Sequence, residues 1–161
     1  MTGSPRMPTA AAALERELLA QIPLARAMAL RVVAHAGESL TLAAPLAPNI
    51  NDKGCAFGGS LASLMTLAGW GVLRLAVAGR DLDCDIYVQD STIRYLAPVW
   101  GELRCQARPA TGESCAAFLD TLAARGKARL RVECTVPLPD GGEAATLSAR
   151  FVALRTDAAA A

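Results

Sequence analysis

Histidine and aromatic side chains are scarce in this sequence: His35 is the one histidine, and Phe, Trp and Tyr make up 4% of the 161 residues. A zinc site therefore has almost no imidazole to use. The five cysteines are an odd number without a C-x-x-C pair, which indicates reduced thiols packed as small apolar side chains. Neither a P-loop nor a dinucleotide fingerprint is present, so we expect no metal and no cofactor.

An excess of either charge is also lacking. Sixteen basic and fifteen acidic residues give a net charge of +1, which argues against a nucleic-acid-binding protein. The hydrophobic fraction of 53% predicts a globular chain that buries apolar surface against another subunit. Residues 1–13 do not have the pattern of a secretory signal, so a cytoplasmic location is expected. We expect one domain over residues 9–156, a flexible N-terminus at 1–8 and a tail at 157–161.

Seventeen uncharged residues extend from Phe57 to Leu73, before Arg74. This run is shorter than the roughly 20 apolar residues that a membrane-spanning helix needs, and it contains serines, a threonine and several glycines. We therefore predict the buried central helix of a globular fold at residues 57–79, and no membrane span.

Hydrophobic periodicity places the other elements around this helix. A short amphipathic helix follows the N-cap Thr9 and stops at Pro23. A change of face near Asp90–Thr92 indicates a bulge in a later strand. The order implies an α+β fold, in which one antiparallel sheet of about six strands covers one side of the central helix and a second subunit covers the other. Strands are predicted at 29–36, 39–44, 86–95, 102–108, 128–136 and 144–154, and a small helix at 114–125, ended by Gly126.

The loop that leads into the central helix carries the most information. It reads Asn51-Asp52-Lys53-Gly54-Cys55-Ala56-Phe57-Gly58-Gly59-Ser60. A helix start offers free backbone N–H groups and the positive end of the macrodipole to an anion or a developing oxyanion. Gly58 and Gly59 allow an acyl carbonyl to approach the backbone closely, and Asn51 is placed to hold the carbonyl or a water. The alternative is that the glycines only let the helix pack under the sheet.

Two strings of residues resemble a known family. Asn51-x-x-Gly54-x-x-Phe57-Gly58-Gly59, with the later Ser91-x-Ile93-Arg94-Tyr95-Leu96-x-Pro98-Val99, is similar to the hotdog-fold thioesterases of the YiiD C-terminal-domain type. The resemblance covers residues 15–155. It implies a hotdog fold, hydrolysis of an acyl thioester of coenzyme A or acyl carrier protein, and a homodimer or dimer of dimers with sites at the subunit interface.

Site roles also follow from the resemblance. It implies that Asn51 positions the nucleophilic water or the thioester carbonyl, and that the Gly59 N–H, beside Gly58, is the main oxyanion donor. Two positions depart from the family pattern: Phe57 stands where a histidine usually precedes the two glycines, and Thr66 stands where the helix carries a carboxylate. The usual general base is therefore missing.

Asp90 is the first candidate to replace that base, with Ser91 or the Thr66 hydroxyl orienting the water. On this hypothesis Asp90→Asn lowers turnover at least about a hundredfold. The alternative interpretation is that Asp90 is a solvated bulge residue or a partner of Arg94.

Basic side chains are candidates for binding the phosphates of coenzyme A or the acidic surface of a carrier protein. The alternative is that they form a solvated strand face. The candidates are Lys53 in the loop, Arg94 in the later strand, and the run Arg125, Lys127, Arg129 and Arg131.

Other features carry less weight. A nucleophilic pair of Cys55 and His35 is disfavoured, because His35 is expected in a hairpin turn. Trp70 and Trp100 are interpreted as packing residues. Four side chains of the central helix are candidates for an acyl tunnel or for its core, namely Ala62, Met65, Leu67 and Gly69.

Two other functions stay open. A non-catalytic acyl-thioester-binding module is favoured by the missing carboxylate. A hotdog dehydratase or isomerase is disfavoured, because that chemistry uses a histidine base and the loop has none.

Overall fold

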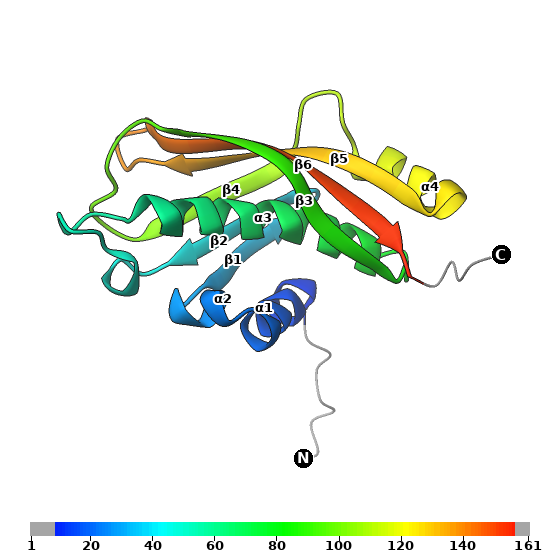
Figure 1. The fold of residues 1–161 in the computed structure, drawn as a ribbon, viewed down its shortest axis with the longest axis horizontal. Helices are drawn as coiled ribbons and strands as arrows, with labels where there is room; N and C mark the ends of the chain where they lie inside the picture. The colour runs from blue at the N-terminus through cyan, green and yellow to red at the C-terminus, as the bar shows by residue number, and fades with distance from the viewer. Residues whose placement is uncertain (1–8, 157–161) are drawn as a thin grey trace, which may run out of the picture.

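A computed structural model describes residues 9–156, so the predicted N-terminus 1–8 and tail 157–161 lie outside the described residues. Six strands form one antiparallel sheet in the order β1-β2-β4-β5-β6-β3. The sheet curves around one long helix, α3 (Gly58–Ala78), as Figure 1 shows. This is the α+β hotdog fold expected from the sequence.

The order of elements agrees with the hydrophobic periodicity. Before α3 come α1 (Ala10–Gln21), α2 (Pro23–Ala27), β1 (Arg31–Ala36), β2 (Ser39–Ala44) and the 3-10 turn η1 (Ala47–Asn49). After it come β3 (Cys84–Tyr95), β4 (Leu103–Pro109), α4 (Cys115–Arg125), β5 (Lys127–Pro137) and β6 (Glu143–Arg155).

Local capping explains where the helices begin and end. The Thr9 hydroxyl oxygen accepts from the backbone N–H of Ala12 at 3.1 Å, as expected for an N-cap. Gly126 ends α4 with a φ of 73°, a left-handed conformation that favours glycine. Pro23 ends the first helix as predicted, but it also begins α2, because its fixed φ and missing N–H suit the first helical position. The hydrophobic pattern did not predict this short helix.

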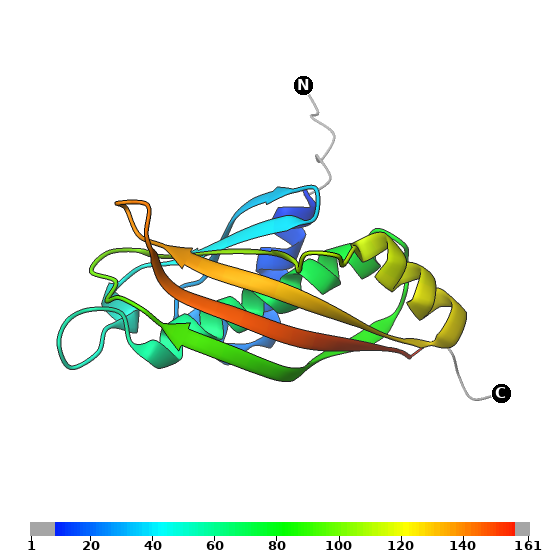
Figure 2. The same ribbon diagram turned by 90° about the horizontal axis from the view of Figure 1, so that it is seen from above.

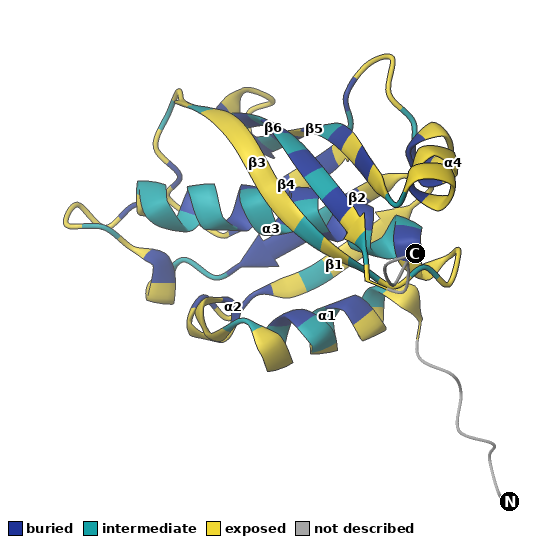
Figure 3. Cartoon of the chain, turned by 45° about the vertical axis from the view of Figure 1, so that its right-hand side comes forward, coloured by how far each residue is buried: buried dark blue, intermediate teal, exposed yellow. Residues whose placement is uncertain are grey.

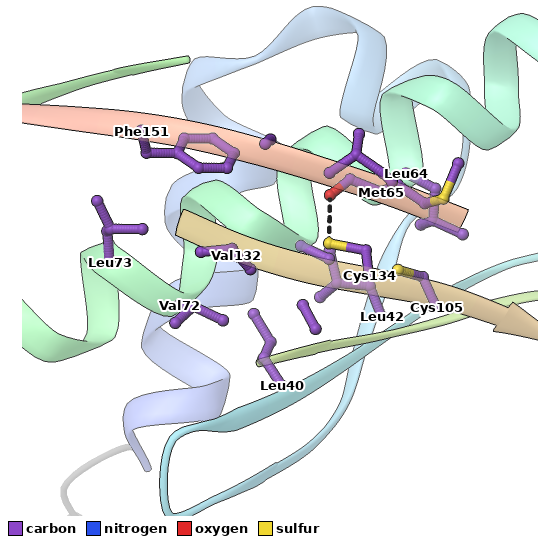
Figure 4. Close-up of a cluster of buried hydrophobic side chains, with 14 of the residues drawn as sticks. Leu40, Leu42, Leu64, Met65, Val72, Leu73, Cys105, Val132, Cys134 and Phe151 are labelled. Atoms are coloured by element: carbon purple, nitrogen blue, oxygen red, sulfur yellow. Dashed lines mark hydrogen bonds between the residues drawn. The ribbon is translucent and has the colours of Figure 1, made fainter. Parts of the chain in front are cut away.

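One face of α3 lies in the core, as Figure 4 shows. A Cβ atom added at Gly69 would lie 2.6 Å from a ring carbon of Phe151, and Phe151 is itself fully buried in β6. A glycine is therefore needed for this close contact between helix and sheet. Of the four acyl-tunnel candidates, Met65 and Gly69 belong to this core, whereas Ala62 and Leu67 are half-buried.

By length and composition α3 is the one helix among residues 9–156 that is apolar enough to cross a membrane. However, 56% of its most apolar window is buried inside the molecule. It is the central helix of the fold, as the sequence analysis expected.

The last strand of the sheet, β3, has one open edge (Figure 3). Tyr87 and Val88 on this strand are 54% and 46% exposed. The neighbouring face of α3 carries a half-buried stripe of Gly59, Ser63, Thr66 and Trp70, which we call the α3 stripe. Exposed apolar groups on an edge strand beside a half-buried helix face are typical of an interface.

Candidate active site

Asn51 organises the loop before α3. Its side-chain oxygen accepts from the backbone N–H groups of Lys53 (2.8 Å) and Cys55 (3.3 Å), and its amide nitrogen lies 3.2 Å from the Cys55 sulfur. Gly54 completes the turn with a φ of 87°. The structure therefore gives Asn51 a turn-forming role in addition to its place in the wall of a cavity beside Gly58.

Asn49 is a residue that the sequence analysis missed. It is 2% exposed, and its amide group donates to the carbonyl oxygens of Met28 (3.0 Å) and Pro45 (2.8 Å). Its own backbone carbonyl accepts from the N–H of Phe57 at 2.7 Å. Asn49 therefore joins the end of α2, the loop and the residue that starts α3. Its long-range contact with Met28 leaves no pattern in the sequence.

The start of α3 presents unused donors. Phe57 is the N-cap and has no side-chain capping bond, and the N–H groups of Gly58 and Gly59 bond to no described residue. A side chain at Gly59 would collide with the Phe57 ring, and one at Gly58 would lie 3.4 Å from the Tyr95 ring. Gly59 thus leaves room for the Phe57 ring against the helix start, whereas a side chain at Gly58 would make an ordinary contact with Tyr95. The two unpaired N–H groups are available to an anion.

A cavity of about 410 Å³ lies beside these donors. Its wall includes Asn51, Gly58, Leu61, Tyr95 and Pro98. Neither a carboxylate nor an imidazole lines it. One copy of the described chain therefore has two unpaired N–H donors next to an apolar cavity, and no carboxylate or imidazole in the wall of that cavity.

Thr66 lies on the α3 stripe, about two turns beyond the helix start. Its hydroxyl donates to the carbonyl oxygen of Ala62 at 2.8 Å, and the hydroxyl of Ser63 donates to that of Gly59 at 2.8 Å. Both hydroxyl protons are thus held by the helix backbone. Their oxygens can still accept a hydrogen bond from a water.

The structure does not bring Asp90 to this site. A register shift between Val88 and Asp90, slightly earlier than the predicted bulge, turns Asp90 to the outer face of the sheet. There it lies 3.8 Å from Arg150 across the strand pair, so its partner is not Arg94. Ser91 instead faces the helix side, opposite the buried Ala149.

We therefore expect Asp90→Asn to change turnover by less than about threefold, because an exposed ion pair contributes little and no reacting group lies near. Steady-state thiol release would measure this. A hundredfold loss of turnover would instead show that Asp90 takes part in the reaction.

The candidate basic residues are spread over the molecule. Arg129 donates to the side-chain oxygen of Gln89 at 3.0 Å on the outer face, and Lys127 lies opposite Leu154, near the Cys84 end of β3. The Tyr95 end, where α3 starts, is roughly 30 Å away along the strand. The structure therefore does not bring Lys127 and Arg129 together with Gly58.

The remaining basic candidates lie elsewhere. Arg125 closes α4, Arg131 lies opposite Arg150, and Arg94 lies opposite Thr146 on the outer face. Lys53 lies 3.0 Å from Asp52, and this contact lowers the pKa of the Asp52 carboxyl.

A second, polar cleft of about 280 Å³ lies at the Cys84 end of β3. Its wall includes Trp70 of the α3 stripe and the carboxylates of Glu17, Asp83 and Asp85. Arg74 donates to Glu17 at 2.8 Å. We call this the acidic cleft. It holds the carboxylates that the cavity at Gly58 lacks.

Cys55 belongs to the wall of the cavity at Gly58, where its sulfur lies against the Asn51 amide nitrogen. His35 lies on β1 and is exposed, whereas Cys55 is buried, and no contact joins the two. Burial and the Glu38 carboxylate raise the pKa of the Cys115 thiol to about 12, so it stays protonated at neutral pH. No group of three or more metal-binding side chains occurs within residues 9–156.

Comparison with known proteins decides the family. Residues 11–155 match the family described as "Putative thioesterase (yiiD_Cterm)". The chain belongs to this family. The match extends over nearly the whole described domain and confirms the resemblance carried by the loop and by the strand that includes Arg94.

Solved structures agree with this assignment to the YiiD C-terminal-domain family. A Shewanella oneidensis protein described as a "putative thioesterase" is 30% identical, with a TM-score of 0.80 over 90% of this chain and 97% of that one. A Chlorobaculum tepidum protein of unknown function is also 30% identical, with a TM-score of 0.83 over 89% and 93%. A Haemophilus influenzae thioesterase, 11% identical with a TM-score of 0.67 over 93% of each chain, shares the fold.

Proposed function

We propose that this member of the YiiD C-terminal-domain family hydrolyses acyl thioesters carried by coenzyme A or acyl carrier protein, in cytoplasmic fatty acid metabolism. The observation that carries the proposal is the pair of unused N–H groups at Gly58 and Gly59, next to an apolar cavity. The thioester carbonyl oxygen accepts from the Gly59 N–H. Water adds to the carbonyl carbon, and the tetrahedral oxyanion is stabilised by this donor and by the helix macrodipole.

The proposal includes a dimer formed through β3. The open edge of this strand offers unpaired backbone groups, and Tyr87 and Val88 on it are exposed. Two copies related by a twofold axis would pair these edges antiparallel and cover the α3 stripe of each other. A second pairing of dimers is compatible with this arrangement.

The dimer also supplies the missing base. A twofold axis reverses the strand direction, so the Cys84 end of one β3 comes beside the Tyr95 end of the other. The acidic cleft lies at the first end and the cavity at Gly58 at the second. In the proposal, a carboxylate of the acidic cleft in one copy accepts the proton of the attacking water in the other copy. The thiol then leaves with a proton, and the products are a carboxylic acid and the free carrier thiol.

The test is thiol release from acyl-coenzyme A and acyl-carrier-protein substrates of short to long chain length. One of Glu17→Gln, Asp83→Asn and Asp85→Asn is expected to lower kcat at least about a hundredfold, because a positioned base contributes that much. Asp90→Asn is the matched control on the same strand. Full activity in all three variants would contradict the proposed base.

Asn51→Ala is expected to lower kcat as well, because it loosens the turn that leads to Gly58. Turnover unaffected by Asn51→Ala would show that this turn does not position the donors.

A second candidate function is a non-catalytic acyl-thioester-binding module. It is favoured by the cavity wall, which has neither carboxylate nor imidazole. It predicts saturable binding of acyl-coenzyme A without thiol release. The same substrate panel therefore separates the two functions.

A further inference from the structure

Trp100 is an exposed tryptophan, although the sequence analysis interpreted it as a packing residue. It lies in the connection between β3 and β4 and is 64% exposed. Trp70, by contrast, is half-buried and donates through its ring N–H to the carbonyl oxygen of Ile86 at 3.2 Å. Trp100 therefore offers an aromatic face that the fold of this chain does not use.

A groove opens beside Trp100 because the sheet divides there. β4 pairs with β2 from Leu103 onward, but its pairing with β5 begins only at Gln106. On the other side β5 ends in a register shift at Pro137, which has no N–H to donate. Figure 2 shows the connection between β3 and β4 passing beside the hairpin of β5 and β6.

This groove has a volume of about 710 Å³, within the range of small-molecule sites. Apart from Trp100, its wall is largely apolar, although it also includes Gly101, Glu102 and Arg104. The apolar residues are Pro98, Val99, Pro137, Leu138 and Pro139. We call it the Trp100 groove.

The mouth of the groove is positively charged. Arg104 lies 3.2 Å from the Glu102 carboxylate, and Arg31 pairs with the other oxygen of the same carboxylate. Two cations thus share one anion, which leaves one net positive charge. All three side chains are between 41% and 53% exposed, so their hydrogen-bonding groups can still reach a ligand.

The Trp100 groove adjoins the oxyanion site. Pro98 belongs to the walls of both cavities. The carbonyl oxygen of the next residue, Val99, accepts from the N–H of Ala56 at 2.8 Å, in the loop that starts α3. A ligand can therefore extend from the groove across Pro98 to Gly58 without leaving the surface.

We propose that the Trp100 groove binds the adenine nucleotide end of coenzyme A, so that the carrier is coenzyme A rather than a protein. This inference rests on the proposed thioesterase function. The adenine ring stacks on Trp100, and phosphate oxygens accept from Arg104 and Arg31. An acyl chain alone would leave the two arginines without a ligand partner, and of the two carriers only coenzyme A has a base that can stack on Trp100.

The test compares two substrates that share one acyl group, an acyl-coenzyme A and the corresponding acyl-pantetheine, which lacks the nucleotide. Trp100→Ala is expected to raise KM for acyl-coenzyme A by about five- to a hundredfold, the range for the loss of one base–aromatic stack. Its kcat, and both constants for acyl-pantetheine, should stay unchanged. Trp100→Phe should retain most of the affinity. Leu24→Ala, at an exposed apolar residue on α2, is the matched control.

Each other outcome has a definite meaning. An equal loss for both substrates would assign the groove to the acyl chain or the pantetheine arm and overturn the proposal, as would no change in KM. If no substrate releases thiol, calorimetric titration with free coenzyme A decides. If the unaltered protein binds coenzyme A and Trp100→Ala abolishes this binding, the nucleotide site is supported although the hydrolase proposal fails. If the unaltered protein does not bind coenzyme A, the nucleotide-site proposal is overturned.

Discussion

Replacing Val88 by arginine is expected to separate the proposed dimer and to lower thiol release at least about a hundredfold. Val88 lies on the open edge of β3, is 46% exposed, and faces the helix side of the sheet, opposite Phe151 in register. In the proposed interface, two arginines would meet near the twofold axis, where their charges repel and lose hydration. Each Gly58 site would then lose the acidic cleft of the other copy.

Size-exclusion chromatography with light scattering would measure the mass, and the same samples would be assayed for thiol release. Leu24→Arg introduces the same charge at an exposed apolar position on α2 and should leave both mass and activity unchanged. A Val88→Arg protein that is monomeric and fully active would contradict the shared site. One that stays dimeric would contradict the β3 interface.

Replacing Asn49 by alanine is expected to lower the free energy of unfolding by about 2–4 kcal/mol. The substitution removes two hydrogen bonds and leaves the carbonyl oxygens of Met28 and Pro45 without that donor in a buried site. The backbone carbonyl of residue 49 accepts from the Phe57 N–H and is kept in the variant, but the side chain no longer holds it in place. The start of α3 should therefore become less well fixed. Urea-induced unfolding followed by circular dichroism would give the difference.

Asn51→Ala is the matched comparison, because Asn51 is half-buried and bonds only within its own turn. It should cost less than about 1.5 kcal/mol in unfolding free energy. If both variants lose the same free energy of unfolding, the bonds from the Asn49 side chain to Met28 and Pro45 contribute no more than those of a local turn.

The strongest local patterns in the sequence were sufficient to predict the fold. The uncharged run after Phe57 predicted the central helix, and alternating side chains predicted the strands around it. Thr9 and Gly126 lie at helix ends because their conformational preferences act locally. The two glycines of the family loop lie where the sequence placed them, at the start of the central helix with unpaired N–H groups, and their catalytic role stays a prediction.

Features that depend on distant contacts were not predictable in this way. Because side chains alternate with a period of two, moving the bulge by one or two residues places Asp90 on the other face of the sheet. Trp100 was interpreted as a packing residue, yet it is exposed, and the groove beside it arises where two strands diverge. The role of Asn49 depends on Met28, which is far away in sequence.

The contact between Gly69 and the Phe151 ring leaves no room for hydrocarbon between helix and sheet at this level of α3. In the proposed dimer, an acyl chain would therefore lie along the α3 stripe and be covered by the other copy. Any substitution in the stripe would alter both sites at once, so evolution cannot adjust the chain-length preference of one site alone. A dimer formed from two different stripe variants would instead contain two sites that differ in their preferred acyl chain length.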